Sequence, residues 1–332
     1  MSRVLFLSKG SDSASTRYRA IDYFPALQER GIEAHHVDIS GSPRNYLAAL
    51  SEARRADVVI VLRKTFGGLF RTLLRHSARR LVFDFDDAIF CNSDGSPSRT
   101  RMRRFQAMMA ACDHVLAGNN FLASAAARFN PAVTRLPTSV DVARYCVDAK
   151  KPCDTLDLVW IGSSSTRKYL EAALPALENA ARQVPKLRLK IIADFTLQSQ
   201  TLPILDVRWD AQTEAREIAS AHIGIAPMVD NDWTRGKCGL KVLQYMAAGL
   251  PVISSRAGVN AEIVRHGENG LLVDSADDWP RSIAALANDE ALRNRLGQSG
   301  QELVRREYTL EVAVERLLQA VASSGRAQPP IG

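Results

Sequence analysis

Short runs of consecutive apolar residues alternate along the chain with longer stretches in which apolar residues recur every three or four positions. Continuous runs are typical of strands buried on both faces of a parallel sheet, and the longer stretches predict helices. The predicted strands are 4–8, 32–37, 58–62, 81–85, 114–117, 133–136, 157–161, 189–193, 223–227, 251–254 and 270–273. The clearest predicted helices are 16–30, 101–112, 169–183, 214–221, 241–248 and 279–287. This alternation indicates an α/β fold.

The strand–helix pattern is interrupted once, between residues 143 and 155, by a polar segment that contains Lys150, Lys151 and Pro152 and has no periodicity. A chain of 332 residues is also longer than one hydrophobic core usually organises. We therefore expect two Rossmann-like domains, 1–148 and 149–308. Residues 309–323 should form a helix at or across the domain junction, and the Gly- and Pro-containing tail 324–332 should be disordered.

The composition is that of a globular protein, with 46% hydrophobic and 24% charged residues. No apolar stretch reaches about 18 residues, and the N-terminal run after Met1 lacks the basic leader of a secretory signal. We therefore expect a cytoplasmic protein. The five cysteines form no CxxC pair, which argues against a zinc site or a disulfide framework.

Positive charge is concentrated in the first half of the chain. Residues 1–150 carry 22 Lys and Arg against 14 Asp and Glu, a net charge of +8, although the whole chain has only +7. Most of the excess comes from arginines between Arg63 and Arg104, with apolar residues between them. This pattern fits a solvated basic face, an anionic membrane surface or a phosphate-bearing acceptor. Nucleic acid is not favoured, because no stacking aromatics accompany these arginines.

The segment 236–253 is the strongest candidate site in the sequence. A loop containing Gly239 leads into a short helix that begins near Leu240 and ends before a buried strand. Unpaired backbone amides at such a helix start stabilise an anion, and Lys237 and Lys241 would add charge. The competing interpretation is an ordinary loop, helix and strand with surface lysines.

Residues 244–253 read Gln-Tyr-Met-Ala-Ala-Gly-Leu-Pro-Val-Ile. This segment closely resembles the Glu-x-Met-Ala-x-Gly-x-Pro-Val-Ile segment of the retaining GT-B glycosyltransferases, glycosyltransferase family 4-like, known as glycosyl transferases group 1. The resemblance continues through Gly258, His266-Gly267 and Asn269-Gly270. It implies two Rossmann-like domains with parallel sheets facing across a cleft, and a nucleotide-sugar donor held by the second domain.

Two positions depart from that family. The family typically has two glutamates with seven residues between them, one near the donor sugar and one on the ribose, where this chain has Gly236 and Gln244. Gln244 keeps hydrogen-bonding capacity for a ribose hydroxyl but lacks the charge of a carboxylate. Some branches of the family place a lysine three residues earlier, and Lys241 fits that pattern as a contact to the donor diphosphate.

A second donor element is expected directly after the strand 157–161. Gly162, Ser164, Arg167 and Lys168 combine a flexible turn, a hydroxyl and two cations before a helix, which suits a phosphate. An ordinary capped helix start explains the same residues.

In the first domain, Gly10 follows the first strand and resembles one glycine of the family's cleft loop. It would allow the donor phosphates to approach the backbone. Arg17 and Arg19 would face the acceptor or lie on an exposed helix.

Three carboxylates, Asp84, Asp86 and Asp87, lie at the end of the strand 81–85, where α/β domains place their sites. Without compensating charges they would repel one another, which points to a function. By resemblance Asp86 and Asp87 take the place of the family's His-Asp pair and orient a hydroxyl or assist the transferred proton. A divalent cation bound by these oxygens is the alternative, but GT-B enzymes generally work without a metal.

The interpretation that best unites these features is a GT-B glycosyltransferase that transfers a sugar from a UDP- or GDP-linked donor to a hydroxyl of a glycan or lipid-linked acceptor. No cofactor is expected besides the donor, which is a co-substrate. The resemblance implies retention of anomeric configuration. The alternatives are a non-catalytic nucleotide-sugar-binding relic and a sugar-nucleotide epimerase of the same architecture.

Overall fold

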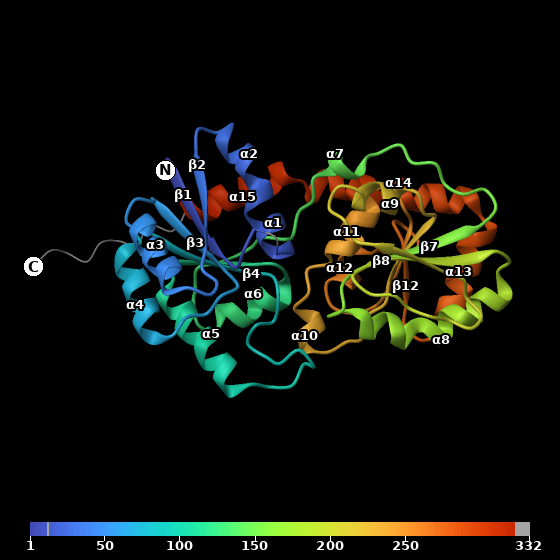
Figure 1. Cartoon of the computed structure of the whole chain (residues 1–332), viewed down its shortest axis with the longest axis horizontal. Helices are drawn as coiled ribbons and strands as arrows, with labels where there is room; N and C mark the ends of the chain where they lie inside the picture. The colour runs from blue at the N-terminus through green and yellow to red at the C-terminus, as the bar shows by residue number, and fades with distance from the viewer. Residues whose placement is uncertain (12, 323–332) are drawn as a thin grey trace, which may run out of the picture. The chain divides into compact units, whose positions relative to one another are not determined.

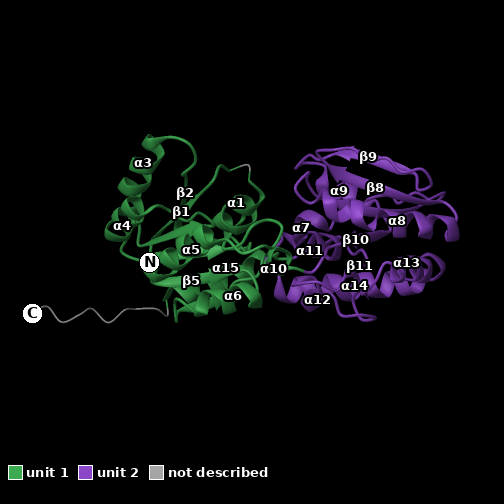
Figure 2. Cartoon of the chain, turned by 90° about the horizontal axis from the view of Figure 1, so that it is seen from below, with its two compact units in different colours: residues 1–139, 231–238, 310–332 green, residues 140–230, 239–309 purple. Residues whose placement is uncertain are grey.

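The computed structural model describes residues 1–11 and 13–322 (Figure 1). The chain forms two compact units (Figure 2): unit 1 comprises residues 1–139, 231–238 and 310 onward, and unit 2 comprises 140–230 and 239–309. The sequence pattern predicts boundaries at 148/149 and 308/309, whereas the structure divides the chain after 139 and after 309. Residues 231–238 also belong to unit 1, which the sequence pattern does not indicate. The tail 324–332 lies outside the described residues.

Unit 1 contains one sheet of six parallel strands in the order β2-β1-β3-β4-β5-β6. The strands are β1 (Arg3–Ser8), β2 (Glu33–Asp38), β3 (Val58–Leu62), β4 (Leu81–Phe85), β5 (His114–Ala117) and β6 (Val133–Arg135). The helices are α1 (Ala14–Arg19), α2 (Phe24–Gln28), α3 (Pro43–Ala53), α4 (Gly68–Ser77), α5 (Arg99–Ala111), α6 (Asn120–Ala127), α10 (Asp232–Arg235) and α15 (Leu310–Ala322), with a 3₁₀ turn at Ile21–Tyr23.

Alternate side chains of each strand enter different cores on the two faces of this sheet, as strand geometry requires. Leu5 and Leu7 of β1 pack with α3, α4, α5 and α6 on one face. Val4 and Phe6 pack with α2 and α15 on the other face. The C-terminal helix α15 therefore completes the core of unit 1. The predicted helix 16–30 is broken into α1, the 3₁₀ turn and α2, with Pro25 in the first turn of α2.

Unit 2 also contains one sheet of six parallel strands, in the order β12-β11-β10-β7-β8-β9. The strands are β7 (Leu156–Ile161), β8 (Leu187–Ala193), β9 (Ile204–Arg208), β10 (Ile223–Ala226), β11 (Val252–Ser255) and β12 (Leu271–Val273). The helices are α7 (Val142–Tyr145), α8 (Arg167–Gln183), α9 (Glu214–Ala219), α11 (Leu240–Ala247), α12 (Asn260–Ile263), α13 (Asp278–Asn288) and α14 (Glu290–Glu307). Helices α8 and α13 pack together on one face, and α9, α11 and α14 on the other (Figure 1).

The predicted α/β fold with parallel sheets is confirmed in both units. The sequence pattern misses one strand, β9, because its residues are only partly buried and include Asp206 and Arg208 at the edge of the sheet. Within residues 1–11 and 13–322, no helix has the length and apolar composition needed to cross a membrane.

Candidate functional site

The turn after β7 is shaped by the tryptophan that precedes it. Gly162 packs so closely on the Trp160 ring that a Cβ at this position would lie 2.3 Å from Cη2 of the indole. Only glycine fits here without a shift of the buried ring. The Gly162 amide donates to the Ile192 carbonyl at 3.1 Å, which anchors the turn at the C-terminal edge of the sheet.

Both hydrogen-bond donors of Ser164 bind Asp194. The Ser164 amide and hydroxyl donate to the two carboxylate oxygens of Asp194, at 2.7 and 2.8 Å, and these bonds lower the pKa of Asp194. In this structure the two Ser164 groups proposed to meet a phosphate are therefore used within the protein. Arg167 pairs with Glu171 at 2.7 Å, and Lys168 lies 5.2 Å from the Tyr169 ring centroid.

The start of α11 is shaped by a glycine in the left-handed region. Gly239 has a φ of +69°, and a Cβ there would lie 2.6 Å from Ile263 Cδ1. This conformation turns the chain into α11, which begins at Leu240. Lys241 lies in the first turn, and its Nζ is 4.3 Å from the centroid of the Trp160 ring. A cation over an indole face is attracted by the ring quadrupole.

One indole therefore brings together two segments that are about 80 residues apart in the sequence. Gly162 contacts the Trp160 ring from the turn after β7, and Lys241 contacts the same ring from the start of α11. Strands β7 and β10 are neighbours in the sheet, and the chain reverses its strand order between them. Open α/β sheets bind ligands at such a switch point.

Gln244 is buried, with 3% of its surface exposed. Its Nε2 donates to Tyr145 Oη at 2.8 Å and to Glu214 Oε1 at 3.2 Å. Sequence analysis misses both partners, because they lie 99 and 30 residues from Gln244 and belong to no motif. The amide that we expected at a ribose is thus held by a buried carboxylate.

The three carboxylates at the end of β4 in unit 1, with Asp84 in the strand and Asp86 and Asp87 after it, are paired with basic side chains, so the repulsion considered from the sequence is compensated. Asp84 and Arg19 form a bidentate pair, with side chains 2% and 0% exposed. Arg63 pairs with both Asp86 and Asp87. Arg19 therefore lies in the core of unit 1 and not on an exposed helix face.

Lys237 reaches the same carboxylates from the segment 231–238. Its Nζ donates to Asp87 Oδ1 at 2.7 Å. Burial and the neighbouring Arg63 guanidinium lower the pKa of Lys237 to about 8. Asn119 holds the segment in place by donating to the carbonyls of Arg235 and Lys237 at 2.9 and 2.8 Å.

The absence of a side chain at Gly236 has a packing reason. A Cβ at Gly236 would lie 2.5 Å from the backbone nitrogen of Ala88. The glutamate expected at this position from the family resemblance would therefore not fit against the turn that follows β4 without a backbone shift. This close approach explains why the chain departs from the motif here.

Gly10 follows β1 at the same C-terminal edge of the unit 1 sheet as Asp86. It has a φ of +29°, and among the described residues a Cβ added there would lie 3.9 Å from a carboxylate oxygen of Asp38. The loop ends at Ser13, whose hydroxyl caps α1 by accepting from the Thr16 amide at 3.3 Å. Gly10 thus lies beside an edge that also carries the acidic pair.

Many of the arginines in the basic first half have structural partners. Arg75 pairs with Asp113, Arg79 with Asp57, and Arg80 donates to the Ala320 carbonyl. Arginines 99, 101, 103 and 104 of α5 are exposed. The charge available to an external anion is therefore concentrated on α5 rather than spread over the whole run.

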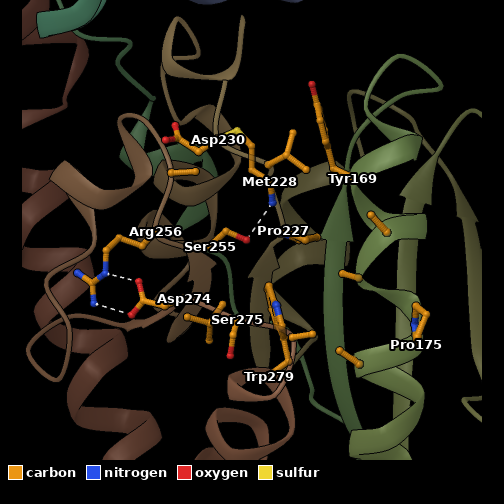
Figure 3. Close-up of a pocket in the computed structure, with 17 residues that line it drawn as sticks. Tyr169, Pro175, Pro227, Met228, Asp230, Ser255, Arg256, Asp274, Ser275 and Trp279 are labelled. Atoms are coloured by element: carbon orange, nitrogen blue, oxygen red, sulfur yellow. Dashed lines mark hydrogen bonds and ion pairs between the residues drawn. The ribbon is translucent and has the colours of Figure 1, made fainter. Parts of the chain in front are cut away.

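A cavity of about 380 Å³ lies in unit 2 between α8 and the C-terminal ends of β10, β11 and β12 (Figure 3). Tyr169, Pro227 and Trp279 form much of its wall. Arg256 and Asp274 at its side bind each other, with Nε and Oδ1 2.7 Å apart. Sequence analysis assigns none of these residues, because the cavity is formed by α8, α13 and the ends of three strands, which only the fold brings together.

No group of three or more His, Cys, Asp or Glu side chains in the described part of the chain is arranged to hold a metal ion.

Comparison with known proteins matches residues 155–289 to the family described as Glycosyl transferases group 1. The lipopolysaccharide core biosynthesis glycosyltransferase LpsE of Rhizobium meliloti is 36% identical over 87 residues, which are 26% of each chain. The phosphatidyl-myo-inositol mannosyltransferase of Mycobacterium leprae is 29% identical over 171 residues, 48% of this chain and 45% of that protein. The chain thus spans less than half the length of these curated relatives.

Solved structures are similar over almost the whole chain. Anabaena HepE, crystallised with UDP and glucose, has a TM-score of 0.73 at 14% identity and covers 97% of this chain and 100% of its own. Sucrose-phosphate synthase from Thermosynechococcus elongatus has a TM-score of 0.75 at 15% identity, covering 98% and 100%. At this identity the similarity establishes the fold, which is the GT-B arrangement of two parallel-sheet α/β units.

Proposed function

We propose that this protein is a glycosyltransferase that transfers a sugar from a nucleotide-diphosphate sugar to a hydroxyl of a glycan or lipid-linked acceptor. The observation that carries the proposal is the convergence of Gly162 and Lys241 on Trp160. These residues place a turn, a helix start and a cation together at the switch point of the unit 2 sheet. The sheet lies in the segment that matches a glycosyltransferase family. HepE, which has the same fold, binds UDP and UDP-glucose.

Lys241 is the principal cation at the donor diphosphate in this proposal. As the bond between the sugar and the phosphate lengthens, negative charge grows on the leaving group, and a cation held in advance at that place lowers the barrier. The indole of Trp160 holds the ammonium of Lys241 in position. Arg167, Lys168 and the amides after Gly239 and Gly162 contribute further attraction to the diphosphate.

Asp86 and Asp87 act on the acceptor side of the reaction. Both are held by Arg63, and Asp87 also by Lys237, so their orientation is set before any substrate binds. We infer that they orient the attacking hydroxyl and take part in removing its proton, with Gly10 lining the same edge. The transfer retains the anomeric configuration and needs no metal ion.

A panel of UDP- and GDP-sugars, read by release of the nucleotide, tests this function. We expect one donor class to be turned over, and we expect Asp86→Asn to reduce transfer while EDTA leaves it unchanged. Activity that is lost in EDTA and restored by Mn²⁺ would replace the proposed mechanism by a metal-dependent one. An isomerised nucleotide sugar formed without acceptor would identify an epimerase instead.

In this proposal, the exposed face of α4 and α5 binds the membrane that carries a lipid-linked acceptor. Leu69 and Leu73 of α4 are 79% and 45% exposed, and α4 packs against α5 with its exposed arginines. Apolar side chains beside arginines favour the surface of an anionic membrane, where each engaged arginine contributes about 1 kcal/mol. A lipid-linked acceptor would be met there.

We expect binding to vesicles that contain anionic lipid, weakening as salt shortens the Debye length. Replacing Arg101, Arg103 and Arg104 by glutamine should reduce cosedimentation with these vesicles. The matched control replaces Arg265, Arg281 and Arg306 of unit 2, whose side chains are 55%, 73% and 61% exposed. If both triple variants lose vesicle binding equally, or if binding does not depend on lipid charge and salt, α5 is an ordinary solvated helix and not a membrane-binding surface.

A further inference from the structure

Trp209 is the most exposed of the four tryptophans, with 41% of its surface accessible. Trp160 and Trp279 are 0% and 4% exposed, and Trp233 is partly buried in unit 1. Trp209 directly follows β9, so it lies at the C-terminal edge of the unit 2 sheet, where parallel α/β sheets bind their ligands. An indole that is presented to solvent at this edge is available to a planar ligand.

The orientation of this indole is set by a buried carboxylate. Trp209 Nε1 donates to Glu214 Oε2 at 2.6 Å. Glu214 is only 2% exposed, and its other oxygen accepts from Tyr145 Oη at 2.6 Å and from Gln244 Nε2 at 3.2 Å. A single carboxylate therefore holds both Trp209 and Gln244, which keeps the indole close to the side chain in the middle of α11.

A second set of contacts connects Trp209 to the turn after β7. Its backbone amide donates to the Ala193 carbonyl at 3.0 Å. The next residue, Asp194, accepts both hydrogen bonds from Ser164. Trp209 thus flanks the same edge as the turn that contains Gly162 and Ser164, through contacts that do not involve Glu214.

We propose that Trp209 is the surface on which the nucleobase of the donor stacks, and that Glu214 is a positioning residue that aligns the Trp209 indole with the Gln244 amide. The inference rests on the proposed binding of a nucleotide sugar by unit 2. Trp209 follows β9 and Gly162 follows β7 at the same C-terminal edge of the sheet, with only β8 between the two strands, so a nucleotide whose base stacks on Trp209 would extend its phosphates toward the turn after β7 and the start of α11.

Stacking is tolerant of the base, because every nucleobase has a π face. Trp209 therefore contributes to affinity for both uridine and guanosine nucleotides and does not by itself select between them. Selection between the two bases falls to the polar groups that meet the edge of the ring.

Calorimetry on the full chain with UDP, GDP and inorganic pyrophosphate tests the role of Trp209. We expect Trp209→Ala to weaken binding of the preferred nucleoside diphosphate by about 5- to 150-fold, the loss of one base–aromatic stack. Trp209→Phe should retain most of the affinity, because a phenyl ring still stacks. Binding of pyrophosphate, which has no base, should be the same in Trp209→Ala and in the parent.

Two outcomes would overturn the inference while the proposed function stands. The first is equal affinity of the parent and Trp209→Ala for the nucleotide. The second is a loss of pyrophosphate binding in Trp209→Ala as large as its loss of nucleotide binding, which would show that the substitution disrupts the whole site. A parent chain that binds no nucleoside diphosphate and turns over no nucleotide sugar would instead remove the proposed function. Val147→Ala, which trims another exposed apolar side chain of unit 2, is the matched control and should bind nucleotide like the parent.

The role of Glu214 is tested by a double-mutant cycle. Glu214→Gln replaces the carboxylate that accepts three hydrogen bonds by an amide, which has only one acceptor oxygen. The indole then loses its alignment, so we expect a raised KM for the nucleotide sugar with little change in kcat. Combined with Trp209→Ala, its effect should be less than additive, since both changes remove the same alignment. Additive effects, or a loss in kcat alone, would show that Glu214 does not act through the indole.

Discussion

Replacing Lys241 by alanine is expected to lower turnover by about 100- to 1000-fold, the usual cost of removing one preorganised group that stabilises charge in a transition state. Lys241 is in the first turn of α11, and its ammonium lies over the Trp160 ring. No other described contact in unit 2 places a cation on that ring. Because the charge grows during bond breaking, kcat should fall by more than the donor KM rises. Steady-state kinetics with the preferred donor measures both.

Two variants separate the loss of this charge from other effects. Lys241→Arg keeps a cation that also stacks on an indole and should retain part of the activity. Lys150→Ala removes an exposed lysine at the opposite edge of the unit 2 sheet and should leave turnover unchanged. If Lys241→Ala turns over like the parent with an unchanged melting temperature, Lys241 is not part of the donor site.

Replacing Arg19 by alanine is expected to destabilise unit 1 by about 3–5 kcal/mol, because it leaves the charge of Asp84 buried without a partner. The Arg19 Nε and Nη2 groups lie 2.6 and 3.0 Å from the two oxygens of Asp84, and Nη2 also donates to the Leu136 carbonyl at 3.1 Å. The pair joins α1 to β4 in the core. Denaturant unfolding, followed by a signal from unit 1, measures the loss.

The double variant Arg19→Met and Asp84→Leu should recover much of this stability, since it removes both charges and keeps similar volume. Arg79→Ala breaks the exposed pair with Asp57, whose side chains are 72% and 28% exposed, and should cost less than about 1 kcal/mol. A small effect of Arg19→Ala would return Arg19 to consideration as a residue that contacts the acceptor.

Local patterns along the chain are enough to predict the class of the fold and the places where a site could lie. Buried parallel strands need unbroken apolar runs, so strands such as β1 and β3 are readable from local pattern. Gly239 is also predictable as a turn position before a helix, because the left-handed backbone conformation it allows is a local property of the chain.

Which of these residues act together depends on the packing of the folded chain. Trp160 joins the turn after β7 to Lys241, and Glu214 joins Gln244 to Tyr145 and Trp209, although most of these partners are far apart in sequence. The fold also neutralises the carboxylates at the end of β4 with Arg19, Arg63 and Lys237. Hydrogen bonds and ion pairs depend on distances of about 3 Å, which only the packing of the sheets and helices sets.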